Sequence, residues 1–399
     1  MASMNHSHPR RIIRSFLPLD VCKELEFIHK SNCTVGYRPR VFSTTLSHLI
    51  ATNCPHLIMP FIPLREKLKE KVEEVFGCEY ELFVEFTGLI SWTKGASIGW
   101  HSDDNRPYLR QRDFTAVCYL NTHDEDFRGG IFHFQDGEPA NFVPMAGDLV
   151  LYTADSCNIH CVDEITDGER LTLTLWFSRN SSHDEDAKLL SLVNQNISDY
   201  GHTPCIPLPA SGNMYWFPSD PLSDHQRGFD LCFARLFFLG YDIYPSQENA
   251  CLPEMVLSGD VSDVFTNPVK LARGGKLFSK EFANLLHALQ AVQFYNWKQS
   301  VLQQSEVTRD TNNVVILSEA QKEEVSNLKQ ALLSHMQLDE NVFCYGKGRE
   351  GPFDWGCLSA AVTWWEEYML ELHKQLQMHL PLWKDHAFLF SVSSSVTEE

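Results

Sequence analysis

The sequence has little of what secreted and membrane proteins carry. Its first residues, Met1 to Arg11, lack the apolar core of a signal peptide. No run reaches the roughly 20 apolar residues that a membrane helix needs, and the longest candidate, residues 231–244, is interrupted by Arg235 and Asp242. The twelve cysteines form no Cys-x-x-Cys pair and are expected to be reduced, mostly buried thiols. These absences predict a cytoplasmic or nuclear protein with no membrane partner.

Positive charge is also scarce. The chain has 33 lysines and arginines against 52 acidic residues, a formal net charge of −19. Such a surface repels phosphate backbones and anionic lipids, so nonspecific binding to nucleic acid or membrane is not expected. The sequence has no internal repeat, and the glycine-rich residues 346–351 match neither phosphate-binding pattern. We interpret that segment as a turn.

The remaining composition is ordinary for a globular protein of 399 residues, with 43% hydrophobic and 21% charged residues. Apolar residues at helical spacing predict helices over residues 20–31 and 60–76, the second ending at Gly77. Short β-rich runs follow, at residues 81–86, 114–120, 130–134, 148–152 and 171–177. Residues 171–176 alternate apolar and polar, which predicts a half-buried strand. Many short strands in about a hundred residues suggest two packed sheets, a jelly roll.

The C-terminal half has a different pattern. Apolar stripes predict three helical stretches, at residues 282–292, 318–336 and 359–380. No group of residues suited to chemistry occurs among them. We expect these helices to pack against the jelly roll, and the alternative is a surface that recognises a substrate.

One small set of residues is suited to metal chemistry. His101 and Asp103 are two residues apart, and His160 and then Arg170 follow farther along the chain. Two histidines and a carboxylate can hold one face of an Fe(II) ion and leave its other positions open. Residues i and i+2 of a strand point to the same face, so His101 and Asp103 could reach one ion together. About one His-x-Asp pair is expected by chance, so the pair indicates a metal site only if the surrounding sequence supports that interpretation.

That sequence resembles the prolyl-hydroxylase type of 2-oxoglutarate- and Fe(II)-dependent dioxygenase. Six segments match the family's motifs in the right order and cover about a quarter of the chain: residues 92–103, 114–121, 129–134, 144–152, 160–170 and the closing Trp176-Phe177. The resemblance implies an α+β fold with a double-stranded β-helix (jelly roll) catalytic core, N-terminal buttressing helices and a mainly helical C-terminal region. The N-terminal helices are expected in residues 1–80, the catalytic core in residues 81–200 and the helical C-terminal region in residues 201–399.

The resemblance also implies roles for these residues. His101, Asp103 and His160 would bind Fe(II) and be the catalytic residues. 2-Oxoglutarate and O2 would take the open positions, and the family allows ascorbate as a further cofactor. Arg170 would pair with the far carboxylate of 2-oxoglutarate, because a guanidinium stays charged and binds carboxylates through two hydrogen bonds. The alternative role of Arg170 is a structural ion pair.

Two positions depart from related patterns. Trp92 stands where the family usually has a tyrosine that holds the co-substrate, and an indole cannot accept a hydrogen bond. Tyr119 or Thr115 is then the candidate to supply the missing contact. AlkB-type nucleic-acid demethylases carry a second arginine where this chain has Trp176, which argues further against a nucleic-acid substrate.

The sequence therefore predicts an enzyme that couples decarboxylation of 2-oxoglutarate to hydroxylation of a substrate. Arg170 resembles the arginine of prolyl 3-hydroxylases and lysyl hydroxylases, so a prolyl or lysyl side chain of a protein or peptide is the expected target. The alternative is a catalytically inactive metal-binding module that serves in interaction.

Overall fold

The computed structural model describes residues 9–38, 40–52, 54–200, 236–242, 290–291, 293–298, 301 and 355–391. In this part of the chain, helices pack against two β-sheets whose strands are antiparallel with one exception. The expected combination of helices and antiparallel sheet is confirmed. The predicted helices at 282–292 and 318–336 and the turn at 346–351 lie largely or wholly outside the described residues.

The larger sheet has nine strands. Its order is β1-β10-β6-β12-β4-β3-β2-β13, and β7 pairs separately with β12. Only the pairing of β13 with β2 is parallel. The strands are β1 (Arg10–Ile13), β2 (Cys33–Arg38), β3 (Val41–Thr45), β4 (Phe83–Thr93), β6 (Phe114–Tyr119), β7 (Phe127–Gly129), β10 (Leu149–Thr153), β12 (Ile165–Ser178) and β13 (Leu236–Asp242).

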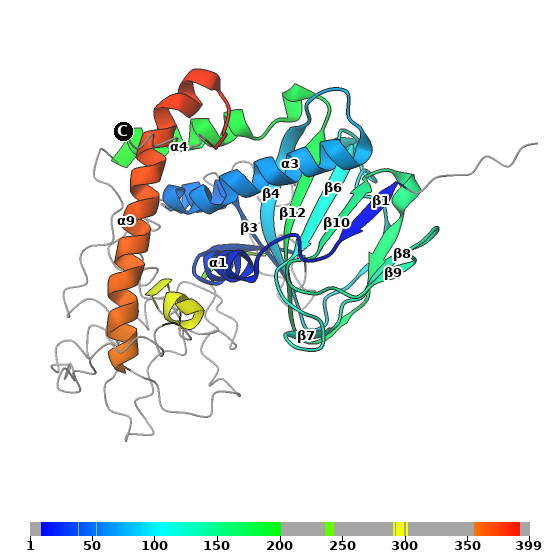
Figure 1. Cartoon of the computed structure of the whole chain (residues 1–399), viewed down its shortest axis with the longest axis horizontal. Coiled ribbons are helices and arrows are strands. Elements are labelled where there is room, and N and C mark those ends of the chain that lie inside the picture. Colours follow the sequence, from blue (N-terminus) through cyan, green and yellow to red (C-terminus); the bar gives the residue numbers. More distant parts are fainter. Residues whose placement is uncertain are drawn as a thin grey trace, which may run out of the picture.

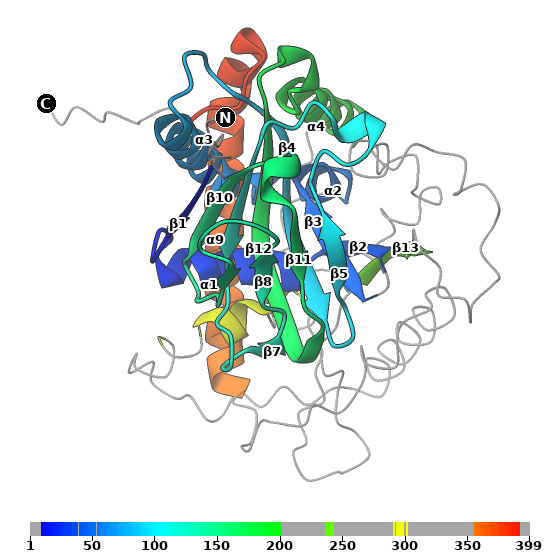
Figure 2. The same ribbon diagram turned by 90° about the vertical axis from the view of Figure 1, so that its right-hand side faces the viewer.

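The smaller sheet faces the larger one. It consists of β5 (Ile98–His101), β11 (His160–Val162), β8 (Phe132–Phe134) and β9 (Asn141–Phe142), in that order. Figure 2 shows β5, β11 and β8 in front of the strands of the larger sheet. Between the sheets lies an aromatic and aliphatic cluster made of Val117, Tyr119, Phe132, Phe134, Phe142, Val150, Tyr152 and Val162. This layer fixes the distance between the two sheets, since protein interiors are densely packed.

Helices cover the opposite face of the larger sheet (Figure 1). They are α1 (Leu19–Lys30), α2 (Leu46–Ala51), the 3₁₀ helix η1 (Pro55–Phe61) and α3 (Ile62–Phe76). Their apolar residues join those of β6, β10 and β12 in one core. The helix predicted at residues 20–31 is confirmed to within one residue at each end. The one predicted at 60–76 begins at Ile62 after η1 and stops at Gly77, which adopts the left-handed conformation with φ of 60°.

Strand β12 is buried on both faces. Leu171, Leu173 and Leu175 enter the helix-covered core, while Thr172 and Thr174 are only 2% and 6% exposed on the other side. The prediction of a half-buried strand was therefore wrong. Alternation of leucine and threonine marks a strand between an apolar core and a polar cavity, because hydroxyl groups can line a site inside the protein.

The paired glycines lie where β7 ends and do not begin the next strand. Gly129 and Gly130 have φ of 73° and 63°, and a Cβ on Gly129 would lie 2.1 Å from the Glu164 carbonyl oxygen. Strand β8 consequently begins at Phe132, two residues later than the predicted strand 130–134. Glycine is needed here because other residues rarely tolerate positive φ and this close approach of backbone.

After β12 and the short η4 (Ser181–His183), helix α4 (Asp186–Tyr200) leads out of the sheets. Helix α9 (Trp355–His386) extends the helix predicted at 359–380 at both ends. It runs beside the helical layer in Figure 1 and packs on η1, with Trp365 and Trp383 fully buried. Within the described residues, no helix has the length and apolar character needed to cross a membrane.

Candidate metal centre

A cavity of about 950 Å³ opens between the two sheets. Both sheets line it, and so does the segment of residues 105–112, which we call the arginine loop. His101, Asp103, His160 and Arg170 all lie on its walls. The structure thus brings together four residues that the sequence spreads over 70 positions.

The two histidines sit opposite each other on adjacent strands of the smaller sheet, where His160 of β11 pairs in register with His101 of β5. His101 Nδ1 lies 2.8 Å from the Gly99 carbonyl oxygen, and His160 Nδ1 lies 2.9 Å from that of Asn158. A carbonyl only accepts hydrogen bonds, so both rings carry their proton on Nδ1. Each Nε2 is left with a lone pair for a metal ion.

Asp103 completes the set, but from a turn. Strand β5 ends at His101, and the backbone N–H groups of Asp103 and Asp104 both donate to the Ala154 carbonyl oxygen, at 2.9 and 3.1 Å. The reasoning from strand alternation was therefore wrong in detail, because the chain leaves the strand between the two ligands. Asp103 Oδ1 still lies 3.8 Å from His101 Nε2 and 3.7 Å from His160 Nε2. One ion could contact all three atoms, and these residues are the only such group found in the described part of the chain.

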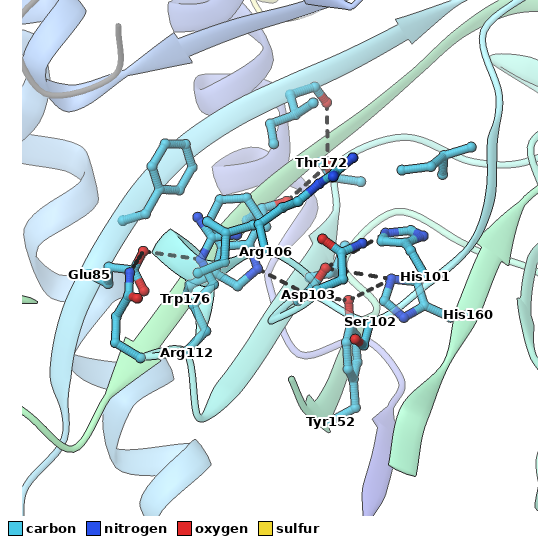
Figure 3. Close-up of a pocket in the computed structure, with 18 of the residues that line it drawn as sticks. Glu85, His101, Ser102, Asp103, Arg106, Arg112, Tyr152, His160, Thr172 and Trp176 are labelled. Atoms are coloured by element: carbon cyan, nitrogen blue, oxygen red, sulfur yellow. Dashed lines mark hydrogen bonds and ion pairs between the residues drawn. The ribbon is translucent and has the colours of Figure 1, made fainter. Parts of the chain in front are cut away.

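The second oxygen of Asp103 accepts three hydrogen bonds from the larger sheet. Thr115 Oγ1, Tyr152 Oη and Trp176 Nε1 donate to Oδ2 at 2.6, 3.0 and 3.1 Å. Figure 3 shows Tyr152 and Trp176 beside Asp103. Thr115 is in register with Tyr152 on one side and with Trp176 on the other. Three neighbouring strands, β10, β6 and β12, therefore present their donors side by side. This row holds the carboxylate so that Oδ1 faces the histidines.

The electrostatics suit cation binding. Burial would raise the pKa of Asp103, but the nearby His160 and His101 and the Thr115 hydrogen bond together lower it below the ordinary value. Burial also lowers the pKa of His160 to about 4. At neutral pH the site therefore offers a carboxylate and at least one neutral imidazole, which are the forms that bind divalent metals.

Arg170 supplies a buried cation on β12, where it is 3% exposed. Its Nη2 donates to Tyr119 Oη at 2.8 Å, and the guanidinium lies 4.9 Å from the Tyr119 ring centre and 5.7 Å from that of Trp92. No hydrogen-bond partner for Nε occurs among the described residues. A buried N–H without a partner is costly, and the carboxylate of a bound dicarboxylic acid would satisfy it. The residues present therefore fit both a divalent metal and 2-oxoglutarate.

The three remaining candidates occupy different places. Tyr119 is at Arg170, and burial raises its pKa, so its phenol stays protonated and can donate to a ligand. Trp92 is buried next to Arg170 as its register partner on β4. Thr115 lies at the metal carboxylate instead, with its hydroxyl proton already donated to Asp103. The structure thus places the Thr115 hydroxyl beside the Asp103 carboxylate.

Sequence reasoning missed Tyr152 and the role of Trp176. Tyr152 was only part of a motif, and Trp176 was noted only as the place of an absent arginine. One pattern could have pointed to Trp176, since Arg170, Thr172, Thr174 and Trp176 alternate with leucines and therefore share a face of β12. Which of them meets Asp103 depends on the register between distant strands.

Comparison with known proteins agrees with this site. Residues 87–178 match the model of the 2OG-Fe(II) oxygenase superfamily, and this range contains all four central residues. The human 2-oxoglutarate and iron-dependent oxygenase domain-containing protein 3 is 34% identical over 128 residues, which are 30% of this chain and 40% of that protein. Human prolyl 3-hydroxylase 1 is 35% identical over 145 residues, 30% of this chain and 19% of that protein. A Pseudomonas putida prolyl-4-hydroxylase structure has 20% identity and a TM-score of 0.36, covering 44% of this chain and 95% of its own.

The chain spans less than half the length of the curated relatives it matches. Residues 87–178 are therefore similar to the 2OG-Fe(II) oxygenase superfamily.

Proposed function

We propose that this protein is an Fe(II)- and 2-oxoglutarate-dependent dioxygenase that hydroxylates a prolyl or lysyl side chain of a polypeptide. One observation carries the proposal. The metal-binding atoms of His101, Asp103 and His160 share a cavity with the buried, incompletely paired guanidinium of Arg170. A site that needed only a metal would have no use for that cation.

Each residue then has a physical task. His101, Asp103 and His160 would hold Fe(II), and Thr115, Tyr152 and Trp176 would fix the orientation of the Asp103 carboxylate. Arg170 and the Tyr119 hydroxyl would bind the far carboxylate of 2-oxoglutarate. When bound, Fe(II) and 2-oxoglutarate supply the chemistry by which O2 is consumed, 2-oxoglutarate becomes succinate and CO2, and one oxygen atom enters a substrate C–H bond.

The same proposal assigns roles to the larger parts of the chain. We infer that the two facing sheets are the jelly roll of such enzymes, with residues 81–200 as the catalytic module, 1–80 as its support and 201–399 as a mainly helical region. The name of prolyl 3-hydroxylase 1 among the relatives supports a prolyl target. Cytoplasm or nucleus stays a prediction from the sequence.

The competing function is a metal-binding module without turnover. It would keep the triad but would not need a co-substrate site, so the cavity around Arg170 argues against it.

The test is decarboxylation of 2-oxoglutarate by the purified chain with and without Fe(II), followed by mass spectrometry of proline- and lysine-containing peptides for the gain of one oxygen atom. Iron-dependent succinate formation supports the dioxygenase. Tight metal binding with no succinate would support the inactive module.

A further inference from the structure

The lining of the cavity is positively charged although the chain is acidic. Among the residues that line it, the cations are Arg106, Arg110, Arg112, Arg170 and Lys188, and the carboxylates are only Glu85 and Asp103. Three of the five cations come from the arginine loop. A cleft with walls of one sign attracts ligands of the opposite sign.

Both carboxylates of the lining are already engaged. Asp103 belongs to the metal site. Glu85 accepts hydrogen bonds from Arg112 Nε and Gln111 Nε2, each at 3.1 Å. Glu85 offsets the charge of Arg112, so Arg106, Arg110 and Lys188 have no carboxylate partner within the lining.

Arg112 anchors the loop. Besides its pairing with Glu85, its guanidinium stacks 3.7 Å from the ring centre of Trp176, the residue that donates to Asp103. Figure 3 shows Glu85, Arg112 and Trp176 in contact on one side of the metal ligands. The arginine loop is thus fixed at a defined distance from the centre where chemistry would occur.

Arg106 and Arg110, unlike Arg112, are not held by neighbouring side chains of the described residues. Both are exposed, both line the cavity, and neither forms an ion pair or side-chain hydrogen bond with any residue that the structure describes. Between them, Tyr108 is 41% exposed. Unpaired arginines next to an exposed tyrosine are typical of surfaces that bind polypeptides.

We propose that the arginine loop recognises carboxylate side chains that flank the target residue of a polypeptide substrate, with Arg106 and Arg110 as the specificity-determining cations. This inference rests on the proposed function and names its substrate class. Arg170 lies deeper and is reserved for the co-substrate, so it does not compete for these carboxylates.

A peptide fits better than a nucleic acid. The cavity cations are local, whereas the whole chain carries a net charge of −19. A long polyanion would extend beyond the loop and meet that negative surface, while a short acidic segment would contact only the loop. Screening over about 8–10 Å makes this difference local at physiological salt.

Binding can be measured without turnover. The full chain, loaded with Mn(II) and 2-oxoglutarate in the absence of O2, is titrated calorimetrically with a short peptide that has one proline flanked by aspartates. The matched peptides carry asparagine or lysine in place of the aspartates, and a single-stranded oligodeoxynucleotide is a further probe. We expect the acidic peptide to bind at least tenfold more tightly than the asparagine peptide, and less tightly as salt is raised.

The variants are Arg106→Gln and Arg110→Gln, with Arg128→Gln as the control. Arg128 is exposed on β7 and does not line the cavity. Each loop variant should weaken the acidic peptide about fivefold, the upper range for an exposed ion pair, and should leave the asparagine peptide unchanged. The control should change neither.

Four results would overturn the proposal: equal affinity for the acidic and neutral peptides, no binding of either, equal effects of Arg128→Gln and Arg106→Gln, or binding of the oligonucleotide but not of the acidic peptide. Failure of the dioxygenase proposal is distinguishable, because it would appear as a lack of iron-dependent succinate formation by the wild-type chain.

Discussion

The three hydrogen bonds to Asp103 Oδ2 predict that a Trp176 variant binds metal more weakly. Replacing Trp176 by phenylalanine removes the indole N–H that donates to Oδ2 at 3.1 Å and keeps an aromatic ring beneath Arg112. A hydrogen bond to a charged group contributes about 1.5–3 kcal/mol. Thr115 and Tyr152 still hold the same oxygen, so we expect the lower end, about 1.5 kcal/mol, which is roughly tenfold in metal affinity.

The assay is a calorimetric titration of the metal-free protein with Mn(II), for wild type, Trp176→Phe and Trp100→Phe. Trp100 is 55% exposed and does not line the cavity, so its variant controls for the loss of an indole elsewhere. The Trp176 variant should bind Mn(II) about tenfold more weakly, with an unchanged unfolding temperature. Wild-type affinity in Trp176→Phe would refute the idea that the indole orients the metal carboxylate.

Three further predictions concern other parts of the structure. Arg170→Ala should raise the Michaelis constant for 2-oxoglutarate at least tenfold, through loss of a charge-assisted pair of about 1.5–3 kcal/mol, with little change in iron affinity; the opposite pattern would make Arg170 structural. Burial raises the pKa of Glu185 to about 7. Between about pH 4.5 and 7 the folded state therefore binds more protons than the unfolded state. The free energy of unfolding should fall across that window by up to about 3 kcal/mol as the pH rises. Denaturant unfolding at several pH values should show that fall in wild type and a smaller one in Glu185→Gln, and identical profiles would contradict the assignment. Trp383 of α9 is fully buried, and its indole N–H donates to the Phe390 carbonyl oxygen at 3.0 Å. Trp383→Ala should therefore destabilise the fold by about 3–5 kcal/mol in denaturant unfolding. A change below about 1 kcal/mol would show that α9 is not part of the core.

Residues and their order predicted much of this arrangement. The helices α1 and α3 followed from apolar spacing and from the stop at Gly77, because these signals are local. His101, Asp103, His160 and Arg170 could be named together only because their flanking segments resembled a family. Nothing in their spacing shows that β5 and β11 are neighbours.

What the sequence could not predict depends on contacts between distant strands. The convergence of Thr115, Tyr152 and Trp176 on one oxygen of Asp103 requires the register of β10, β6 and β12. The burial of both faces of β12 has the same origin, since the second sheet lies over its threonines. The arginine loop was not identified from the sequence for another reason. The net charge of −19 is a sum over the whole chain and does not reveal a local excess of positive charge.

The proposed function depends on Asp103 as a metal ligand of an active oxygenase. The most direct measurement is iron-dependent succinate formation from 2-oxoglutarate by wild type, Asp103→Ala and Asp104→Ala. Asp104 is the neighbouring carboxylate, bonded to Ser102 Oγ at 2.6 Å and outside the group of three metal-binding residues. We predict succinate formation in wild type and Asp104→Ala, and none in a folded Asp103→Ala protein. Wild-type turnover in Asp103→Ala, or no turnover by the wild-type chain with Fe(II), would contradict the proposed function.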